Sequence, residues 1–393
     1  MPPQPAPAGA SIDPLTASAE IDLDAFAANL SAIAGHVAPA ELMIVVKADG
    51  YGHGMLACAR AARATGCRWL GVATPGEALA LRAVGDEGRL LAWLYGPEED
   101  LSPLVAADVD VSAHTPAQVS ALAAGAGTAE RLARVHLKID TGLSRNGAAA
   151  NAWPELCAAA AEAEQAGALS VVAVWSHFAS ADEPGAASVS QQLAAFEDAY
   201  AVAQAAGLSP QRHLGNSAGA LIVPEAHFDL VRVGIAAYGI DAAPGVAELA
   251  GVSLRPVMRL RAQLVNVKEL AAGTAVSYGG TWVSPHSTSV GLVPLGYADG
   301  IPRHAGNRAE VTAGGRRAPV RGRICMDQFV VELGPDAAAS EGDQVVLFGS
   351  GDAGEPTAED WARWCDTIGY EIVTRIGSRV PRVYRGGPAD VRS

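Results

Sequence analysis

The chain has 393 residues, half of them apolar and 18% charged, so it can bury a large core, and its length suggests two domains. A net charge of −14 without any lysine or arginine block excludes a typical nucleic-acid-binding surface. The five cysteines form no CxxC pair, which disfavours a zinc or disulfide framework and favours a reducing compartment. No apolar run is long enough to span a bilayer, and residues 1–17 lack the features of a secretory signal. We therefore expect a cytoplasmic protein that begins with a disordered, Pro/Ala-rich tail.

Short β-like runs alternate with alanine-rich stretches of helical character through residues 18–252. Eight strands that alternate with helices over about 200 residues predict a (β/α)8 barrel of the TIM type. A doubly wound open sheet is the alternative, but no GxGxxG motif follows the first strand. The predicted strands are residues 42–47, 69–74, 90–95, 109–114, 135–140, 170–177, 212–216 and 230–235, and the clearest helices are residues 78–84, 117–124, 153–166 and 191–206.

After about residue 251 the helical stretches nearly vanish and alternating apolar runs separated by glycine-containing turns take their place. This pattern predicts a mostly antiparallel β domain over residues 253–393. Its predicted strands are residues 257–267, 289–295, 317–324, 329–333 and 344–348, with one helix at residues 357–365. The short run at residues 19–23, before the barrel, is compatible with a strand in either domain.

The first predicted barrel strand delivers a single lysine, Lys47, to its end, and a glycine-rich loop with Tyr51 and His53 follows at once. A lysine at the tip of a buried strand is partly desolvated, which lowers its pKa and frees the amine as a nucleophile. An aldehyde cofactor needs such an amine to form a Schiff base. On these residues alone, a glycine turn with the lysine reaching into solvent explains the pattern equally well.

Polar residues also lie at the ends of the later strands, where TIM-type barrels carry their chemistry. Each has a purely structural explanation: His177 as a buried core histidine, Ser217 as a helix N-cap, Arg232 as an ion-pair partner. Their convergence on one rim favours a site instead, and a helix start at Ser217 with the amide of Gly234 suits a phosphate. The full set is Lys47, Lys138, Asp140, Arg145, His177, Asn216, Ser217, Arg232, Gly234 and Ile235.

The order and spacing of these motifs resemble those of bacterial alanine racemases, the fold-type III pyridoxal-phosphate enzymes, from about Ala19 to the end of the chain. The matching segments are VKADGYGHG (residues 46–54), HLKIDTG (136–142), HFASADE (177–183), NSA (216–218), VRVGI (231–235), VSYG (276–279), PLGYADG (294–300), CMDQ (325–328) and IGYE (368–371).

The resemblance implies that Lys47 holds pyridoxal 5′-phosphate as a Schiff base and acts as one catalytic base. Tyr278 is then the second base, because racemisation needs proton donors and acceptors on both faces of a planar carbanion. A free tyrosine has a pKa of about 10, too high for an efficient base at neutral pH. In the family, His177 links this tyrosine to Arg232, which faces the pyridine nitrogen and keeps it unprotonated.

Further roles follow from the same resemblance. Arg145 contacts the cofactor's phenolic oxygen and the substrate, and Lys138 matches a lysine that is carbamylated in many family members. The implied phosphate contacts are Tyr51, Ser217, Gly234, Ile235 and Tyr370, and the implied substrate contacts are Met326, Tyr297 and Asp327. The implied substrate corridor, narrow enough to favour small substrates, consists of Tyr297, Arg303, Arg323, Asp182 and Ile368.

In the family the β domain completes the site of the partner subunit, so the resemblance implies an obligate homodimer. The predicted reaction is the interconversion of L- and D-alanine, supplying D-alanine for peptidoglycan in a bacterium, with no metal, nucleic-acid or membrane partner. A serine or broad-spectrum racemase, an amino-acid decarboxylase and a non-catalytic cofactor carrier are the alternatives. The chain departs from the usual family residues at Gly50, Ser144 and Gly369, which puts loop rigidity and substrate selectivity in question.

Overall fold

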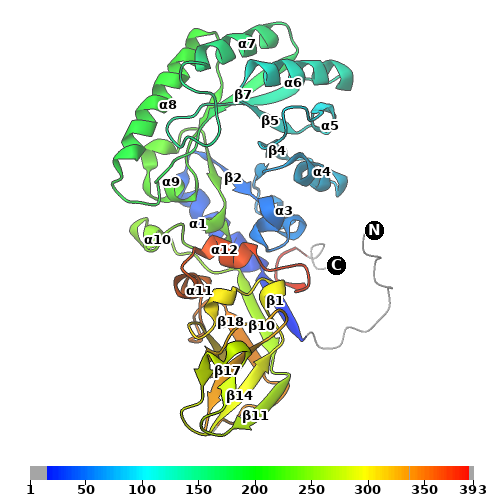
Figure 1. The fold of residues 1–393 in the computed structure, drawn as a ribbon. Helices are drawn as coiled ribbons and strands as arrows, with labels where there is room; N and C mark the ends of the chain where they lie inside the picture. Colours follow the sequence, from blue (N-terminus) through cyan, green and yellow to red (C-terminus); the bar gives the residue numbers. More distant parts are fainter. Residues whose placement is uncertain (1–15, 336, 389–393) are drawn as a thin grey trace. The chain divides into compact units, whose positions relative to one another are not determined.

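The computed structural model describes residues 16–335 and 337–388, so nearly all of the predicted N-terminal tail lies outside the described residues. The chain divides into two compact units (Figure 1). Of the described residues, 22–257 and 384–388 form one unit, and 16–21 with 258–383 form the other.

The first unit is a parallel barrel, which confirms the fold predicted from the sequence. Its strands are hydrogen-bonded in the order β8-β7-β6-β5-β4-β3-β2-β9. Between β8 and β9 the ladder gives way to single backbone bonds, such as Arg232 N–H to Gly215 O at 2.9 Å, so the barrel is nearly closed. The strands are β2 (Glu41–Val45), β3 (Trp69–Val72), β4 (Arg89–Ala92), β5 (Asp110–Ala113), β6 (Ala133–Lys138), β7 (Leu169–Trp175), β8 (Gln211–His213) and β9 (Leu230–Val233).

Helices surround these strands on the outside (Figure 1). Two of the predicted helices start earlier than the apolar periodicity indicated, because Thr74 and Thr115 cap α4 and α6 and a proline follows each cap. The helices of this unit are α1 (Leu23–Val37), α2 (Lys47–Tyr51), α3 (Met55–Ala64), α4 (Pro75–Ala83), α5 (Ser102–Ala106), α6 (Pro116–Ala129), α7 (Trp153–Gln165), α8 (Ala187–Ala205), α9 (Ser217–Ile222), η1 (Pro224–Ala226), η2 (Ile235–Tyr238) and α10 (Val246–Leu249).

The second unit contains a nine-stranded sheet in the order β11-β14-β17-β16-β15-β18-β10-β1-β19, whose described pairings are antiparallel, as predicted. The early strand joins this unit, since β1 pairs with β10. The strands are β1 (Ala17–Asp22), β10 (Met258–Gln263), β11 (Asn266–Leu270), β14 (Thr288–Val293), β15 (Glu310–Ala313), β16 (Arg316–Arg321), β17 (Phe329–Gly334), β18 (Gln344–Phe348) and β19 (Arg382–Arg385), with a separate pair β12 (Ala275–Val276) and β13 (Trp282–Val283).

One predicted strand is wrong in its extent. The single run at residues 257–267 is two strands, β10 and β11, which lie far apart in the strand order of the sheet. Val265 N–H bonds to Leu292 O, so the chain has already crossed to β14 at that point. Apolar alternation continues through the crossover, which is why the sequence gives no sign of it. The remaining elements are α11 (Ala358–Cys365), α12 (Gly369–Thr374), η3 (Tyr278–Gly280), η4 (Tyr297–Asp299) and η5 (Arg303–Ala305).

Candidate active site

Lys47 does not end a strand as predicted; it opens α2, two residues after β2 ends. The four residues that follow it all have positive φ: 53° at Ala48, 53° at Asp49, 61° at Gly50 and 53° at Tyr51. A left-handed turn costs roughly 1–2 kcal/mol for each residue other than glycine. The backbone next to Lys47 is therefore strained, and strained backbone is typical of functional sites.

Hydrogen bonds to side chains hold this strained turn in place. Glu77 in the first turn of α4 accepts from Ala48 N–H at 2.7 Å, and the Asp49 carboxylate accepts from Met55 N–H at 2.8 Å. Asp49 O also accepts from Gly54 N–H at 2.8 Å. Two anchors on neighbouring helices thus fix the backbone from which Lys47 projects.

The Lys47 ammonium is in an environment that favours its neutral form. Burial lowers the pKa of Lys47, the nearby charges of Arg145 and Arg232 lower it further, and only Glu77 opposes them. Within the described residues no carboxylate lies within ion-pair distance of its Nζ, which sits 5.9 Å from the centre of the Trp93 ring. A neutral amine is the nucleophilic form that the sequence predicted.

Arg232 is buried, and its two terminal nitrogens are fully engaged. Nη1 donates to His213 O and faces His213 Nδ1, both at 2.9 Å. Nη2 donates to Ser176 O at 2.7 Å and Leu214 O at 3.1 Å and lies 3.2 Å from His177 Nδ1. Burial lowers the pKa of Arg232 to about 9, so it stays charged at neutral pH. Its Nε–H makes no hydrogen bond within the described residues, which leaves one donor for a ligand.

Both histidines beside Arg232 are neutral. Burial and the Arg232 charge hold the pKa of His177 and of His213 well below the usual range. Because Arg232 only donates, the Nδ1 atoms facing it must carry lone pairs. The sequence analysis identified His177 as a candidate but missed His213, which contacts Arg232. His213 ends the three-residue strand β8, and no motif in the sequence marks it.

Lys138 ends β6 beneath the same rim, with Nζ 4.2 Å from the centre of the Trp175 ring. Burial and then the charges of Arg232 and Arg145 lower the pKa of Lys138 to about 7, against the opposing effect of Asp140. Within the part of the chain that the structure describes, Lys138 has no ion-pair partner. The barrel rim thus gathers two lysines and two arginines in a protein whose overall charge is negative.

The loop that carries Arg145 is tied back to its own strand. Asp140 Oδ1 accepts from the N–H groups of Gly142 at 2.9 Å and Ser144 at 3.1 Å. Gly147 lies so close to the backbone of β6 that a Cβ there would come within 2.6 Å of Asp140 N. These contacts present Arg145 as an exposed side chain at the rim.

Four of the predicted phosphate contacts, Tyr51, Ser217, Gly234 and Ile235, lie in the barrel unit. Ser217 Oγ accepts from Gly234 N–H at 3.0 Å, and the Tyr51 hydroxyl lies where a Cβ on Gly234 would be, 2.2 Å away. The backbone N–H groups of Ser217, Ala218 and Ile235 donate to no group in the described parts of the chain. Glycine is therefore required at 234, and the free amides are suited to an anionic group.

The second predicted base lies in the β unit and is exposed. Tyr278 begins η3 and its residue is 71% accessible to solvent. Ser277 before it has φ of 61°, and its hydroxyl donates to Arg323 O at 2.7 Å. Gly322 packs against the same turn, where a Cβ would lie 2.6 Å from Val276 O. The backbone around Tyr278 is thus strained and fixed even though its ring is open to solvent.

The predicted substrate contacts Tyr297 and Met326 lie together. Tyr297 N–H donates to Cys325 O at 3.1 Å, and Ala298 N–H donates to Met326 O at 2.9 Å. Tyr297 is 44% and Met326 52% exposed. The Met326 N–H donates no hydrogen bond within residues 16–335 and 337–388, so it is available to a carboxylate.

For the remaining predicted residues, the structure gives their exposure and, for Asp327, an ion pair. Asp327 pairs with Arg379 at 2.8 Å, and its role as a substrate contact stays a prediction. Tyr370 lies half-buried in the first turn of α12, and Ile368 before it is 60% exposed. Arg303, Arg323 and Asp182 are exposed.

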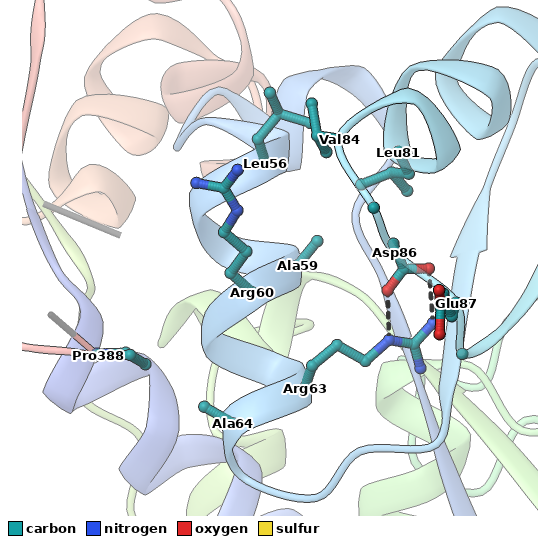
Figure 2. A pocket seen from close by; sticks show the side chains of 12 residues that line it. Leu56, Ala59, Arg60, Arg63, Ala64, Leu81, Val84, Asp86, Glu87 and Pro388 are labelled. Atoms are coloured by element: carbon teal, nitrogen blue, oxygen red, sulfur yellow. Dashed lines mark hydrogen bonds and ion pairs between the residues drawn. The ribbon is translucent and has the colours of Figure 1, made fainter. Parts of the chain in front are cut away.

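A surface cavity of about 680 Å³ lies between α3 and the turn after α4, and none of the predicted site residues lines it (Figure 2). Figure 2 shows Arg63 of α3 reaching across it to Asp86, and the two pair at 2.7 Å. Arg63 also donates to the carbonyl of Cys67 at 3.0 Å. These contacts tie α3 to the neighbouring loops, so the cavity is bounded by structural ion pairs.

Comparison with known proteins matches one family over nearly the whole chain. The family described as "Alanine racemase, N-terminal domain" matches residues 21–242, and "Alanine racemase, C-terminal domain" matches residues 257–384. The chain is 51% identical over 371 residues to the alanine racemase of Frankia casuarinae, covering 94% of this chain and 96% of the relative. It is 52% identical over 376 residues to that of Streptomyces coelicolor, again covering 94% and 96%. The crystal structure of alanine racemase from D-cycloserine-producing Streptomyces lavendulae superposes with a TM-score of 0.94 at 48% identity, covering 97% of this chain and all of that one.

Proposed function

The chain belongs to the alanine racemase family, an isomerase family, and we propose that it interconverts L- and D-alanine with pyridoxal 5′-phosphate bound at the barrel rim. The observation that carries the proposal is the rim itself, which gathers Lys47, Lys138, Arg145 and Arg232. Burial, and then repulsion among these cations, lowers the pKa of both lysines. Such a group of cations calls for an anionic ligand.

The residues present fit this cofactor. Its phosphate matches the cradle of free amides around Ser217 and Gly234, into which Tyr51 projects. The available Nε–H of Arg232 matches a ring nitrogen that accepts a hydrogen bond. Lys47 would hold the cofactor, Arg145 would neutralise its phenolic oxygen, and Tyr370 would add a phosphate contact. When bound, pyridoxal phosphate supplies an electrophilic aldehyde carbon and a conjugated ring that acidifies the substrate's α-proton.

Two residues of the chain would move the proton. Lys47 Nζ, whose pKa is lowered by burial and by neighbouring cations, would accept or return the α-proton on one face. Tyr278 Oη would serve the other face, where the family resemblance links it to His177, a neutral histidine whose Nδ1 lies 3.2 Å from Arg232 Nη2. Arg232, charged and buried, would keep the ring nitrogen unprotonated. A decarboxylase would gain from a carboxylate at that position, so Arg232 favours the racemase over that alternative.

We propose that the active form is a homodimer in which each β unit completes the partner's barrel site. Tyr278, Tyr297, Met326 and Ile368 are large side chains left 44% to 71% exposed. Exposed apolar groups on a rigid backbone are typical of surfaces that are covered in an assembly.

The described residues contain no helix long and apolar enough to cross a membrane. We place the protein in the bacterial cytoplasm, where it supplies D-alanine for peptidoglycan.

We also propose that the Lys138 amine is carbamylated. With a pKa of about 7 its amine is neutral at mildly alkaline pH, the form that reacts with carbon dioxide. The resulting carbamate would place a negative charge beside Arg145 and orient that arginine toward the cofactor's phenolic oxygen. Intact-protein mass spectra recorded with and without bicarbonate test for this adduct.

The experiment that tests the function is a D-amino-acid assay on purified protein supplied separately with L-alanine, L-serine and L-lysine and with pyridoxal phosphate. D-alanine formed much faster than the other products supports the proposal and a corridor narrowed by Tyr297. Comparable rates would make the protein a serine or broad-spectrum racemase. If no D-product formed while the cofactor stayed bound, the racemase assignment would fail and decarboxylation or a carrier role would be tested next.

A further inference from the structure

A chain of buried polar side chains runs through the barrel interior behind Arg232. Asp110 on β5 contacts His136 on β6, with 3.0 Å between Oδ2 and Nε2. His136 Nδ1 lies 2.8 Å from Nε2 of His213 on β8, and His213 Nδ1 lies 2.9 Å from Arg232 Nη1 on β9. All four residues are buried, with at most 4% of any of them exposed. We call Asp110, His136 and His213 the core relay.

The donor and acceptor at every link are determined by the two ends. Arg232 has only N–H donors, so His213 Nδ1 must accept and its proton must reside on Nε2. His213 Nε2–H then donates to His136 Nδ1, which places the second proton on His136 Nε2. That proton is donated to the Asp110 carboxylate, which only accepts when ionised. Both histidines are thereby fixed as the Nε2–H tautomer.

The far end of the core relay is held as an anion. Arg134 Nε lies 2.5 Å from Asp110 Oδ1, and Arg89 pairs with its Oδ2. Burial opposes ionisation of Asp110, but hydrogen bonds and charges from His136 and Arg89 keep its pKa below the usual range. Burial also lowers the pKa of His136, so it stays neutral beside the carboxylate. The relay therefore starts from a fixed negative charge.

Packing prevents the rings from turning to another arrangement. The His213 ring stacks on Trp175 at 5.5 Å with an angle of 11°, and the His136 ring meets Trp69 edge-on at 5.6 Å. If His213 held its proton on Nδ1 instead, it would point an N–H at Arg232 and lose its donor to His136. A buried polar network in which one link fails leaves unpaired groups at both ends of that link.

We propose that Asp110, His136 and His213 are positioning residues, which fix the tautomer of His213 and thereby hold the Arg232 guanidinium with its Nε–H toward the site. None of the three touches a reacting atom; their effect reaches the site only through Arg232. The expected effect of the core relay on activity rests on the proposed function, whereas the tautomer assignment does not. In metal sites, mutating the residues that hydrogen-bond to the metal ligands and orient them lowers affinity or activity by about 10- to 100-fold.

The first test determines the tautomers directly in the wild-type holoenzyme and uses a variant only to assign the signals. Long-range ¹H–¹⁵N spectra of holoenzyme labelled with ¹⁵N-histidine distinguish the Nδ1–H, Nε2–H and doubly protonated rings. We expect both His136 and His213 to be neutral Nε2–H tautomers at pH 7, with signals assigned by comparison with the His136→Gln variant. A proton on Nδ1 of His213, or a charged ring at either position, would overturn the core relay.

The second test compares two substitutions at one position. In H136Q the amide oxygen accepts from His213 and the amide N–H donates to Asp110, so the polarity of the chain is kept. In H136L a side chain of similar bulk breaks it. We expect kcat near the wild-type value for H136Q and about 10- to 100-fold lower for H136L, with weaker binding of pyridoxal phosphate seen in its absorbance titration.

The outcomes separate the two proposals. Equal losses in H136Q and H136L, with thermal unfolding unchanged in both, would show that the polarity of the chain is unimportant and would refute the positioning role. Wild-type kcat and cofactor binding in H136L would refute it as well. If the wild-type protein lacked racemase activity but showed the expected tautomers, the proposed function would fail and the relay would stand.

Discussion

The two halves of the proposed site are built in opposite ways. In the barrel, Arg232, Lys138 and Ser217 are buried and surrounded by partners from the same chain. In the β unit, Tyr278 and Met326 are more than half exposed, and only their backbone is held. The barrel half is thus packed within one chain and lacks only an anion to offset its cations, whereas the β half presents side chains that still need a counterpart. The predictions below test this contrast.

The largest expected effect is at the attachment point of the cofactor. Lys47→Ala should abolish nearly all activity and the absorbance of bound cofactor, because no other amine at the rim lies on the strained turn. Absorbance spectra and the D-alanine assay measure both. Lys268→Ala, an exposed lysine on β11, is the matched control and should change neither. Activity retained in Lys47→Ala would sink the central assignment.

On the β side, Tyr278→Phe should keep the bound chromophore and abolish racemisation in at least one direction, since it removes only one hydroxyl. Initial rates starting from L-alanine and from D-alanine test this. A variant that racemised normally in both directions would exclude the two-base scheme.

A mixed dimer tests whether the two halves come from different subunits. When Lys47→Ala and Tyr278→Phe proteins are unfolded together and refolded at equal amounts, half of the dimers are hybrids with one intact site. Activity should return to roughly a quarter of the wild-type value for a twofold dimer with shared sites. Wild-type protein refolded alone is the control. No recovery against an active control would mean that Lys47 and Tyr278 of one chain serve the same site.

A smaller effect concerns the stability of the barrel half with pH. Lys138 has a pKa of about 7 in the folded state and about 10.4 when unfolded, so between these values the unfolded chain binds more protons. Stability contributed by this group therefore rises with pH from about 7 to 10. The melting temperature of wild type minus that of Lys138→Met, measured without bicarbonate, should increase over this window. A flat difference would contradict the buried, neutral lysine.

The smallest effect is at the lysine turn. Gly50 has φ of 61°, and a Cβ there would lie 3.3 Å from Met55 N, so Gly50→Ala should destabilise the protein by about 1 kcal/mol. Urea unfolding measures the change. Gly35→Ala is the matched control, because Gly35 is exposed in α1 with nothing within 4 Å of its Cβ position, and there alanine should stabilise instead. Gly50 thus relieves backbone strain in the turn that follows Lys47.

Much of the barrel half was predictable because its signals are local. Eight apolar runs separated by alanine-rich stretches predicted the strands, and polar residues at their ends predicted the rim. The split of residues 257–267 into β10 and β11 was not predictable, since the alternation runs on through the crossover. Nor was the ion pair between Asp327 and Arg379 predictable, because it joins residues 52 positions apart.

Sequence alone predicted most of the strands and helices, singled out Lys47 and Tyr278 as candidates, and resembled the family to which the chain belongs, because these depend on residue types and their order along the chain. Only the tertiary structure decided that Lys47 opens a left-handed turn, that Lys138 has a pKa of about 7, and that His136 and His213 connect Asp110 to Arg232. Strain, desolvation and hydrogen-bond polarity depend on which groups are brought together in space. They arise here because parallel strands point side chains that are distant in sequence into one barrel interior.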